Sequence, residues 1–432
     1  MRIILAATPA SGHLNPILAV ARIMVYHGHD VLVTTGSVFR AKVEATGARF
    51  APLPFGADMD LSDIDTRFAD RKNLAPGLPM LAFDLKHLFI NTIAAQFSGL
   101  ETLLQEFPAE LIVSDIMYGG CLPFLLGARP RRPAIVGLGV NCLLTRREDG
   151  APIGLGLPPA TDADTVATYR SIADEVDTLV LNPARLHVDA ILESLGASPL
   201  PMPYIEAMTS LPDLFLQPSV PGFEFPCMVL PPNLHFIGAL PIPAGDPLTP
   251  ELAAAVADGR KLVLVTQGTV ANHDLGQLIG PTLAALADRD DLIVLVATGR
   301  KPVTEIPGPL PDNALAAEFL PFGALMPHID LLVTNGGYGA VTQALSNGVP
   351  VVAAGTTEDK QDVNARIAWC GVGIDLRTEA PSVEQLREAI GTALRDPSYR
   401  KKAHALAAEY EAHDAEANLL NLLQRAVRNH DA

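Results

Sequence analysis

Cysteine is scarce in this sequence, which argues against a metal site built from closely spaced cysteines and against an oxidising compartment. Four cysteines occur among 432 residues, and they are Cys121, Cys142, Cys227 and Cys370. They stand far apart and form no metal-ligand spacing. We therefore expect a reduced, cytoplasmic protein.

Basic residues are also few, with 31 lysines and arginines against 48 aspartates and glutamates, so the net charge is −17. This balance argues against a nucleic-acid-binding surface and against a general attraction to anionic membranes. It leaves open one locally basic pocket for an anionic ligand. Aromatic residues make up only 5% of the chain against 49% hydrophobic residues, so we expect cores built from aliphatic residues and alanine.

Long apolar runs are missing as well. No stretch of about 18 uninterrupted apolar residues is present, so we expect no transmembrane helix. The first apolar run breaks at Pro9, Gly12 and His13. This pattern indicates a first strand and not a signal peptide.

The chain is long enough for two domains. A length of 432 residues predicts two α/β domains of about 200 residues each. Prolines are dense over residues 199–250, and the end of this region resembles a linker, which predicts a boundary near Leu240. We expect an N-terminal domain over residues 1–240, a second domain over 241–415, and a C-terminal helix over 416–432 that packs back on the first domain.

The first half opens with an apolar strand over residues 2–7. Asn15-Pro16 is a sound helix start, with Asn as N-cap, so His13 is expected in the loop just beyond this strand. A second apolar strand, residues 110–114, is followed directly by Asp115. If both strands are parallel members of one sheet, His13 and Asp115 lie at the same edge, where open α/β sheets bind ligands.

The second half carries two glycine turns, each after an apolar strand. The strand over residues 261–266 ends at Gln267-Gly268-Thr269, and the strand over 329–333 ends at the turn Asn335-Gly336-Gly337-Tyr338-Gly339. Helical spacing over 340–347 predicts that this second turn opens a helix, whose free N–H groups favour an anion such as a diphosphate. The alternative is that these glycines only let the helix pack tightly on the strand.

Three D-x-D strings could hold a divalent metal, but none follows a clear strand. They are Asp58-Met-Asp60, Asp63-Ile-Asp65 and Asp162-Ala-Asp164. We interpret them as solvated loop acids. Two loop-rich segments, residues 55–81 and 145–165, are candidate rims of a pocket.

Several motifs, taken in order, match one family of enzymes. They are Gly12-His13-Leu14-Asn15-Pro16, Gly28-His29-Asp30-Val31, Gln267-Gly268-Thr269, Phe319-Leu320-Pro321, Asn335-Gly336-Gly337-Tyr338-Gly339, Asp359-Lys360 and Asn364-Ala365. With these motifs the chain resembles, over essentially its whole length, the two-domain glycosyltransferases that use nucleotide sugars and glycosylate small apolar acceptors. The resemblance implies the α/β GT-B fold, in which two Rossmann-like domains with parallel sheets face each other across a deep cleft.

The resemblance also implies residue roles. His13 matches the general base that deprotonates the acceptor hydroxyl, and Asp115 matches the aspartate that orients the imidazole. The activated oxygen then attacks the anomeric carbon on the face opposite the leaving diphosphate, which inverts the configuration. The positions that match donor-binding residues are Gly268, Thr269, Phe319, Leu320, Asn335, Gly336, Gly337, Gly339, Ala340, Gln343, Asp359 and Lys360.

Three of these positions depart from the usual residues of the family. Asn335 stands in place of a histidine, and its amide could donate to a phosphate oxygen. Gln343 stands in place of a glutamate that accepts from ribose hydroxyls. Lys360 stands in place of the glutamine in an Asp-Gln pair that holds sugar hydroxyls, and it either reaches a sugar hydroxyl or a phosphate or is solvated.

The sequence therefore predicts an inverting, metal-independent glycosyltransferase of the hexosyltransferase type. Its expected partners are a UDP- or dTDP-sugar co-substrate and an apolar small-molecule acceptor, with no cofactor and no nucleic acid, in a monomer or a homodimer. Two alternatives stay open. One is a nucleotide-sugar epimerase of the same fold, and the other is a catalytically silent nucleotide-binding relative.

Overall fold

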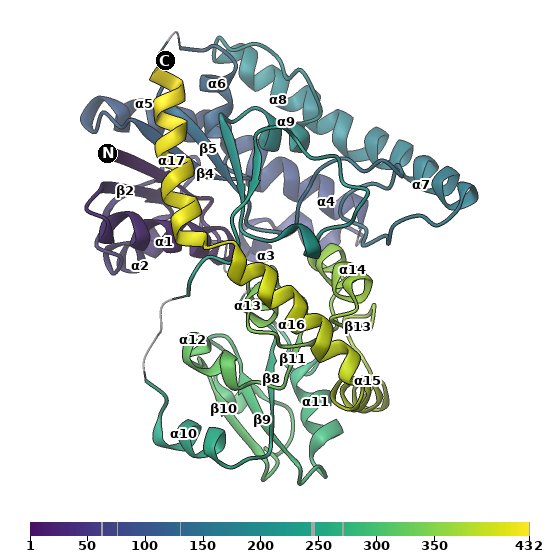
Figure 1. Ribbon diagram of the computed structural model, residues 1–432. Helices are drawn as coiled ribbons and strands as arrows, with labels where there is room; N and C mark the ends of the chain where they lie inside the picture. The colour runs from purple at the N-terminus through teal and green to yellow at the C-terminus, as the bar shows by residue number, and fades with distance from the viewer. Residues whose placement is uncertain (62–63, 76, 130, 243–246, 270–271, 432) are drawn as a thin grey trace.

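Two parallel sheets, one in each half of the chain, form the framework of the protein (Figure 1). The computed structural model describes residues 1–61, 64–75, 77–129, 131–242, 247–269 and 272–431. The strands of the first sheet are β1 (Arg2–Ala6), β2 (Asp30–Thr35), β3 (Arg49–Pro52), β4 (Leu111–Asp115), β5 (Ala134–Leu138), β6 (Leu214–Gln217) and β7 (Leu234–Phe236). The strands of the second sheet are β8 (Lys261–Thr266), β9 (Leu292–Ala297), β10 (Ala314–Ala317), β11 (Leu331–Thr334), β12 (Val351–Ala353) and β13 (Gly373–Asp375).

The strand order reverses once in each sheet, and these reversals position the site. The first sheet has the order β3-β2-β1-β4-β5-β6-β7, and the second has the order β10-β9-β8-β11-β12-β13. The central pairs are therefore β1 with β4, where Ala6 pairs with Ser114, and β8 with β11, where Thr266 pairs with Thr334. Because loops leave in opposite directions at such a point, it is where open α/β sheets form a ligand crevice.

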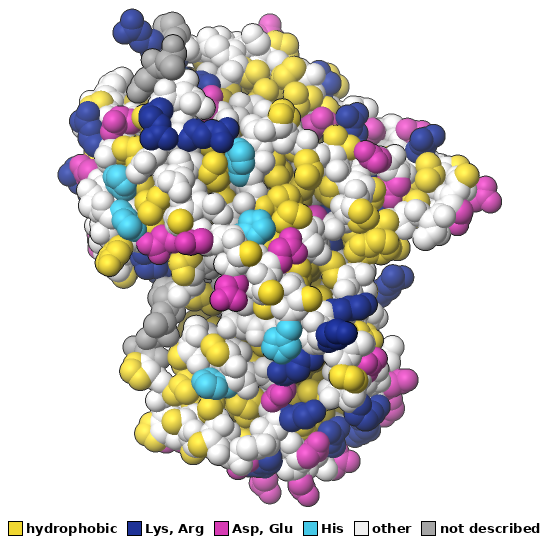
Figure 2. Space-filling model, in the orientation of Figure 1, with side chains coloured by type: hydrophobic (Ala, Val, Ile, Leu, Met, Phe, Trp, Pro, Cys, Tyr) yellow, Lys and Arg dark blue, Asp and Glu magenta, His cyan; other side chains and the backbone are white. Residues whose placement is uncertain are grey.

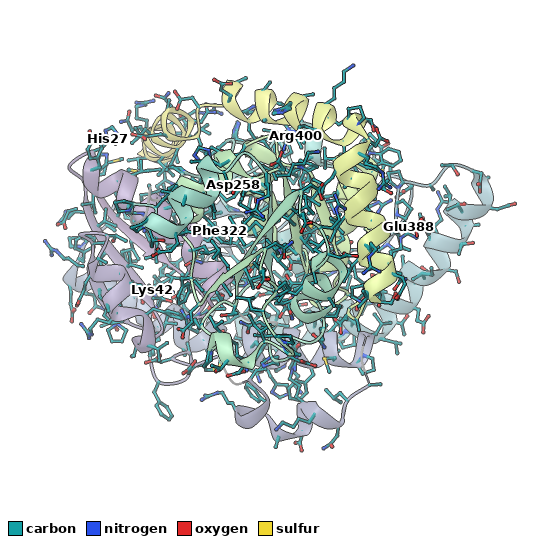
Figure 3. The ribbon with its side chains drawn as sticks, turned by 90° about the horizontal axis from the view of Figure 1, so that it is seen from below. His27, Lys42, Asp258, Phe322, Glu388 and Arg400 are labelled. Carbon is teal, nitrogen blue, oxygen red and sulfur yellow. The ribbon has the colours of Figure 1, made fainter. Side chains whose placement is uncertain are left out.

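Helices cover both faces of each sheet. On the first sheet they include α1 (Ser11–Tyr26), α2 (Arg40–Glu44), α5 (Ile93–Glu106), α6 (Leu122–Leu125), α8 (Asn182–Ser194) and α9 (Tyr204–Ser210), whereas α7 (Ala163–Val176) projects outward from this lobe (Figure 1). On the second they include α10 (Pro250–Ala257), α11 (Ile279–Leu286), α12 (Phe322–Leu325), α13 (Tyr338–Ser346), α14 (Lys360–Cys370) and α15 (Val383–Arg395). Figure 3 views the molecule from below and shows the helices that carry Glu388 (α15) and Arg400 (α16, Pro397–Ala412) along the outside of the second sheet.

The chain returns to the first sheet at its C-terminus. After α16 it turns at His413, and α17 (Ala415–Asp431) places Leu419 and Leu423 in the same buried cluster as strand β1 and helix α1. The outgoing and returning segments touch, because a Cβ on Gly238 (φ +85°) would lie 2.9 Å from the Cβ of His413. In the space-filling view the surface narrows between the two lobes, where these segments pass (Figure 2).

The prediction of two Rossmann-like parallel sheets is confirmed, and several elements match closely. The apolar runs over residues 261–266 and 292–297 both predict buried strands, and they are β8 and β9. The spacing of Ser382 and Gln385 in the sequence predicts a capping box that opens a helix, and it is present at the start of α15, since each of the two side chains bonds to the backbone of the other residue. Among the described residues, no helix is both long enough and apolar enough to cross a bilayer.

The predicted start of the first helix is wrong. Helix α1 begins at Ser11, because the amides of His13 and Leu14 already bond to the carbonyl of Ala10, and Asn15 is not its N-cap. Pro16 lies inside the helix and cannot donate to the Gly12 carbonyl, a defect that is tolerated near a helix N-terminus. His13 is therefore on the first turn of a helix and not in a loop.

The spacing of Leu81, Leu85, Leu88, Phe89 and Ile93 predicts one long helix over residues 80–97, but the helix in the structure is irregular. It consists of α4 (Leu78–Asp84), a π-helical turn η3 (Leu85–Phe89), a 3₁₀ turn η4 (Ile90–Thr92) and then α5. A π turn inserts one residue into the helix, and such insertions are frequent at functional sites. Sequence periodicity cannot reveal one inserted residue, so the prediction missed it.

Candidate active site at the facing edges of the two sheets

His13 and Asp115 form the centre of the site on the first sheet. His13 Nδ1 lies 2.8 Å from Asp115 Oδ1, and the Asp115 side chain is fully buried. Asp115 is the last residue of β4 and His13 lies on the helix that follows β1, so both are at one edge of the sheet, as the sequence predicted. Because the carboxylate accepts from Nδ1–H, Nε2 of the imidazole is left with its lone pair.

The Asp115 carboxylate is fixed by backbone donors. Thr8 N donates to Oδ2 at 2.6 Å, and Met117 N donates to Oδ1 at 2.8 Å. Burial alone would raise the pKa of Asp115, but the His13 charge and these hydrogen bonds bring it below its usual value. The buried side chain therefore stays ionised, which is the state that holds His13 in one tautomer.

The pKa of His13 is raised above its usual value by its neighbours. Burial lowers it, but the charge and hydrogen bond of Asp115, followed by the charges of Asp359 and Glu358, outweigh burial. Asp359 and Glu358 belong to the second half of the chain, just before α14. Their influence on His13 indicates that the two sheet edges face one another at this point.

The ring of Phe89 adds an apolar wall beside His13. Its centroid lies 5.8 Å from that of the imidazole, and it comes from the π-helical turn η3. The sequence predicted Phe89 only as part of an apolar helix face. The irregular helix thus brings an aromatic ring to the proposed base.

On the second sheet, the two predicted glycine turns are tied together. Asn335 Nδ2 donates to the Gln267 carbonyl at 2.7 Å, which links the loop after β11 to the loop after β8. Asn335 is buried, so this amide bridges protein backbone at the place where the family usually has histidine. Gly336 has φ +97°, and a Cβ there would collide with the Asn364 side chain. Only glycine fits this position.

The helix start that follows is open. Leaving aside the chain neighbours and the backbone of the same helix, no described atom lies within 4 Å of where a Cβ on Gly339 would be, and for Gly337 the described atom within that distance is Asn335 Oδ1, at 3.8 Å. Gly268, on the neighbouring loop, is equally open and has φ +72°. Open space therefore lies beside Gly337 and Gly339 at the positive end of helix α13, which is the kind of place where phosphates bind.

The residues that begin α14 carry opposite charges. Lys360 is only 4% exposed and its ammonium pairs with Glu358, so the alternative in which Lys360 is solvated is wrong. Burial raises the pKa of Asp359 to about 6, with Glu358 adding to the effect and Lys360 opposing it. Glu358 has φ +56°, a strained conformation that often marks functional segments.

The other predicted donor residues lie around this edge. Phe319 is 61% exposed and Thr269 is exposed. Leu320 is half-buried against the apolar cluster on one face of the second sheet. Gln343 Nε2 donates to the Leu240 carbonyl at 3.2 Å, so its amide group also contacts the segment that joins the sheets. Ala340 is half-buried in the first turn of α13.

Two of the D-x-D acids, Asp58 and Asp162, accept hydrogen bonds from nearby backbone amides, so these two are not only solvated loop acids. Asp162 caps α7 by accepting from Thr165 N at 2.8 Å. Asp58 accepts from Ser37 N at 2.9 Å. Asp63 lies outside the described residues.

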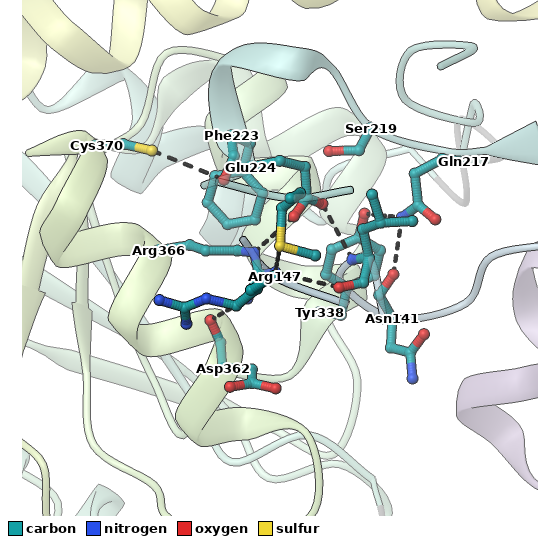
Figure 4. Close-up of polar contacts among 12 residues, drawn as sticks. Asn141, Arg147, Gln217, Ser219, Phe223, Glu224, Tyr338, Asp362, Arg366 and Cys370 are labelled. Carbon is teal, nitrogen blue, oxygen red and sulfur yellow. Dashed lines mark hydrogen bonds and ion pairs between the residues drawn. The ribbon is translucent and has the colours of Figure 1, made fainter. Parts of the chain in front are cut away.

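The predictions did not identify a set of contacts that joins the two halves beside the site (Figure 4). Arg366 Nε lies 2.7 Å from Glu224 Oε2, with both side chains 3% exposed. Gln217 Nε2 donates to the Tyr338 hydroxyl at 2.9 Å, and Asp362 accepts from the amides of Gly154 and Gly156. No local motif distinguishes these residues, because each partner is more than a hundred positions away in the sequence.

Comparison with known proteins places this geometry in context. Residues 281–424 match the family model described as erythromycin biosynthesis protein CIII-like, C-terminal domain. The chain is 35% identical over 427 residues to 4'-demethylrebeccamycin synthase of Lentzea aerocolonigenes, covering 99% of each chain. It is 36% identical to UDP-glycosyltransferase 2 of Phaeomoniella chlamydospora, covering 96% of this chain and 93% of the relative.

A solved structure agrees in fold. Spinosyn rhamnosyltransferase SpnG, complexed with thymidine diphosphate, superposes with a TM-score of 0.69, covering 98% of this chain and 100% of that one. Its sequence identity is only 19%, so this likeness supports the arrangement of the two sheets alone.

Proposed function

The chain belongs to the nucleotide-sugar-dependent glycosyltransferases of the GT-B fold, and on this premise we propose an inverting, metal-independent transfer of the hexosyltransferase type. The donor is a UDP- or dTDP-sugar, and the acceptor is a hydroxyl of an apolar small molecule. The observation that carries the proposal is the His13–Asp115 pair, 2.8 Å apart at the central strands of the first sheet.

His13 acts as the general base in this proposal. Asp115 holds Nδ1, so Nε2 takes the proton from the acceptor hydroxyl while the acceptor oxygen forms its bond to the anomeric carbon. The bond from that carbon to the diphosphate oxygen breaks, and its electron pair leaves with the nucleoside diphosphate. The ionised Asp115 stabilises the imidazolium that results.

The second sheet supplies the donor site. We place the diphosphate at the first turn of α13, at Asn335, Gly336, Gly337, Gly339 and Ala340, with Gly268 and Thr269 from the neighbouring loop. The open space at Gly337 and Gly339 and the helix dipole support this placement. Charge on the leaving group is then met by backbone N–H groups, with no cofactor and no metal required.

The remaining donor residues are assigned to the nucleoside and the sugar. The exposed ring of Phe319, with Leu320, holds the base, and Gln343 accepts from ribose hydroxyls. Asp359 and Lys360 hold sugar hydroxyls near His13, which is consistent with the effect of Asp359 on the pKa of His13. The named relative supports a UDP-sugar, and the thymidine diphosphate complex of SpnG supports a dTDP-sugar.

The acceptor site is assigned to the first domain. The Phe89 ring provides an apolar surface beside His13. The long loop over residues 141–162 is assigned to the acceptor because Asp362, on the first turn of α14, accepts from its Gly154 and Gly156 amides. We propose domain limits of 1–240, 241–415 and 416–432, a cytoplasmic location, no nucleic-acid partner and a monomer or homodimer. The reported relatives carry transferase or synthase names, so neither an epimerase nor a silent relative is favoured.

A direct experiment tests the base. The full-length protein is incubated with UDP- and dTDP-sugars and a panel of apolar hydroxyl acceptors, and the anomeric configuration of the product is read by NMR. His13→Ala should reduce turnover by about 10²- to 10⁴-fold. His27→Ala, a change at an exposed histidine just past the end of α1, is the matched control and should keep turnover within about twofold.

Three outcomes would contradict the proposal. Unchanged turnover in His13→Ala would show that His13 is not the base. A product with the anomeric configuration of the donor would contradict inversion. Loss of turnover on EDTA treatment would contradict metal independence. Conversion of the donor without any acceptor would instead support the epimerase.

A further inference from the structure

Tyr338 is the first residue of α13 and lies within the second glycine turn, yet its hydroxyl contacts the first sheet. Gln217 Nε2, at the end of β6, donates to the Tyr338 hydroxyl at 2.9 Å. The hydroxyl donates in turn to the carbonyl of Pro218 at 3.3 Å. Figure 4 shows Tyr338 and Gln217 pointing toward one another. The proposed diphosphate turn is therefore joined to the opposite domain by one side chain.

The anchor on the first sheet is itself rigid. Gln217 is 1% exposed, and its Nε2 also donates to the Asn141 carbonyl, just beyond β5, at 2.8 Å. Gly139 leaves it no spare room, because a Cβ there would collide with the Gln217 side chain. A side chain held from two strands cannot follow a moving partner, so Tyr338 is tied to a fixed point.

The contact persists across the working pH range. Burial raises the pKa of Tyr338 well above its usual value, so the hydroxyl stays protonated and keeps both of its bonds. The ring lies in the apolar cluster on one face of the second sheet, together with Val220 and Phe223 of the first half of the chain. The domains therefore share packed apolar surface around this bond, which holds the hydroxyl in place.

We propose that Tyr338 is a positioning residue for glycosyl transfer, which sets the distance from the glycine turn that holds the leaving diphosphate to the base His13. This rests on the proposed function. His13 and the turn are on different domains, so no bond within either domain can set that distance. Reaction rates respond steeply to such distances, since a misplacement of about 1 Å reduces the rate by about 100-fold.

A second tyrosine provides a matched control. Tyr410, on α16, is as buried as Tyr338, and its hydroxyl lies 3.4 Å from Ser219 Oγ, two residues beyond β6. It therefore also joins the two halves of the chain through one hydroxyl. It is remote in sequence from the glycine turn. A general loss of interface stability would affect both tyrosines, whereas a positioning role belongs to Tyr338 alone.

The experiment compares the full-length wild type with Tyr338→Phe and Tyr410→Phe. We expect Tyr338→Phe to lower kcat by about 10- to 100-fold. The Kd for UDP or dTDP, read by calorimetry, should stay within about threefold, because the nucleotide contacts one domain only. Tyr410→Phe should keep kcat within about threefold and shift the thermal midpoint as much as Tyr338→Phe does.

A partner variant tests the same bond from the other side. Gln217→Leu should lower kcat in the same way, and the double variant with Tyr338→Phe should be no slower than the slower single variant. The proposal is overturned if Tyr338→Phe keeps kcat within threefold, if both tyrosine variants lose kcat equally, or if the loss is in nucleotide Kd. Since His13→Ala is assayed in parallel, wild-type turnover in that variant would refute the proposed base separately.

Discussion

At the scale of single residues, the site is organised by carboxylates whose pKa values move in opposite directions. Asp115 is fully buried but receives backbone donors and the imidazole, so its pKa falls. Asp359 is half-buried with Glu358 beside it, so its pKa rises to about 6. Both charges raise the pKa of His13, which lies between the two sheets. Opposed shifts of this kind are typical of acid–base sites.

Replacing Asp115 by asparagine should change both the rate and its pH dependence. Loss of the carboxylate removes the partner that fixes the tautomer, so kcat/KM should fall by about 10²- to 10⁴-fold. The Asp115 charge raises the pKa of His13 and burial lowers it, so the acidic limb of kcat/KM should move to lower pH. Asp330→Asn, at the opposite edge of the second sheet, should leave the profile unchanged, and an acidic limb that stays in place in Asp115→Asn would refute this linkage.

Replacing Asp359 by asparagine should stabilise the protein while impairing transfer. A carboxylate whose folded pKa is raised destabilises the fold where it is charged, so the gain should be full above about pH 6 and absent below pH 4. Its size is on the order of 1 to 3 kcal/mol after allowance for partial exposure. Thermal unfolding of both proteins from pH 4 to 8 measures it, and equal midpoints at pH 7.5 would contradict the expectation.

At the scale of elements, the loop between β5 and α7 is built around two acids. Asp149 accepts from the amides of Ala151 and Ala160 inside the loop. Asp362, on the first turn of α14, accepts from Gly154 at 2.7 Å and from Gly156 at 2.8 Å. A loop of the first domain is therefore held by the helix whose start carries Asp359 and Lys360. The proposed acceptor and donor surfaces are therefore linked through one carboxylate.

Asp362→Ala should release this loop and weaken acceptor binding. Two hydrogen bonds to a charged group are lost, so the acceptor KM should rise by about 10-fold or more, with the nucleotide Kd unchanged. Asp362→Asn keeps one carbonyl acceptor and should give an intermediate value. Asp162→Asn, at the other end of the loop, replaces one good N-cap by another and should behave as wild type. An unchanged acceptor KM in Asp362→Ala would exclude the loop from the acceptor site.

At the scale of the whole molecule, the two domains are joined by a buried network as well as by two crossings of the chain. Arg366 bonds to Glu224 and to the carbonyl of Leu143, and its guanidinium stacks 4.5 Å from the ring of Phe225. The Cys370 thiol donates a hydrogen bond to the Gly222 carbonyl at 3.3 Å. A connection of this kind resists large changes of domain angle, and that stiffness is what allows Tyr338 to set a distance.

Arg366→Met should strongly destabilise the protein, because it leaves Glu224 buried and unpaired. Breaking a buried pair in this way lowers the free energy of unfolding by about 3 to 5 kcal/mol. The double variant with Glu224→Gln should recover part of that stability, because it no longer buries an unpaired charge. Arg289→Met, which breaks an exposed pair with Asp291, should change stability by less than about 1 kcal/mol. Urea unfolding measures all four proteins, and similar losses for Arg366→Met and Arg289→Met would refute the role of the buried pair.

The sequence by itself determined the class of fold and the residues that we propose for the chemistry. Apolar runs such as 261–266 report burial directly, and glycine turns and the His13 motif are contiguous, so local pattern was enough to find them. It also predicted that His13 and Asp115 share a sheet edge, since parallel strands end together.

Only the tertiary structure decided how the two edges are held against each other. The helical position of His13, the π turn that brings Phe89 to it, and the bonds of Tyr338 and Asp362 all depend on partners far away in the chain. A pairing across a hundred residues leaves no periodic signal, because its energy is realised only when both segments are packed. Local motifs were therefore enough to predict the reaction class, but they could not predict the geometry that we propose for it.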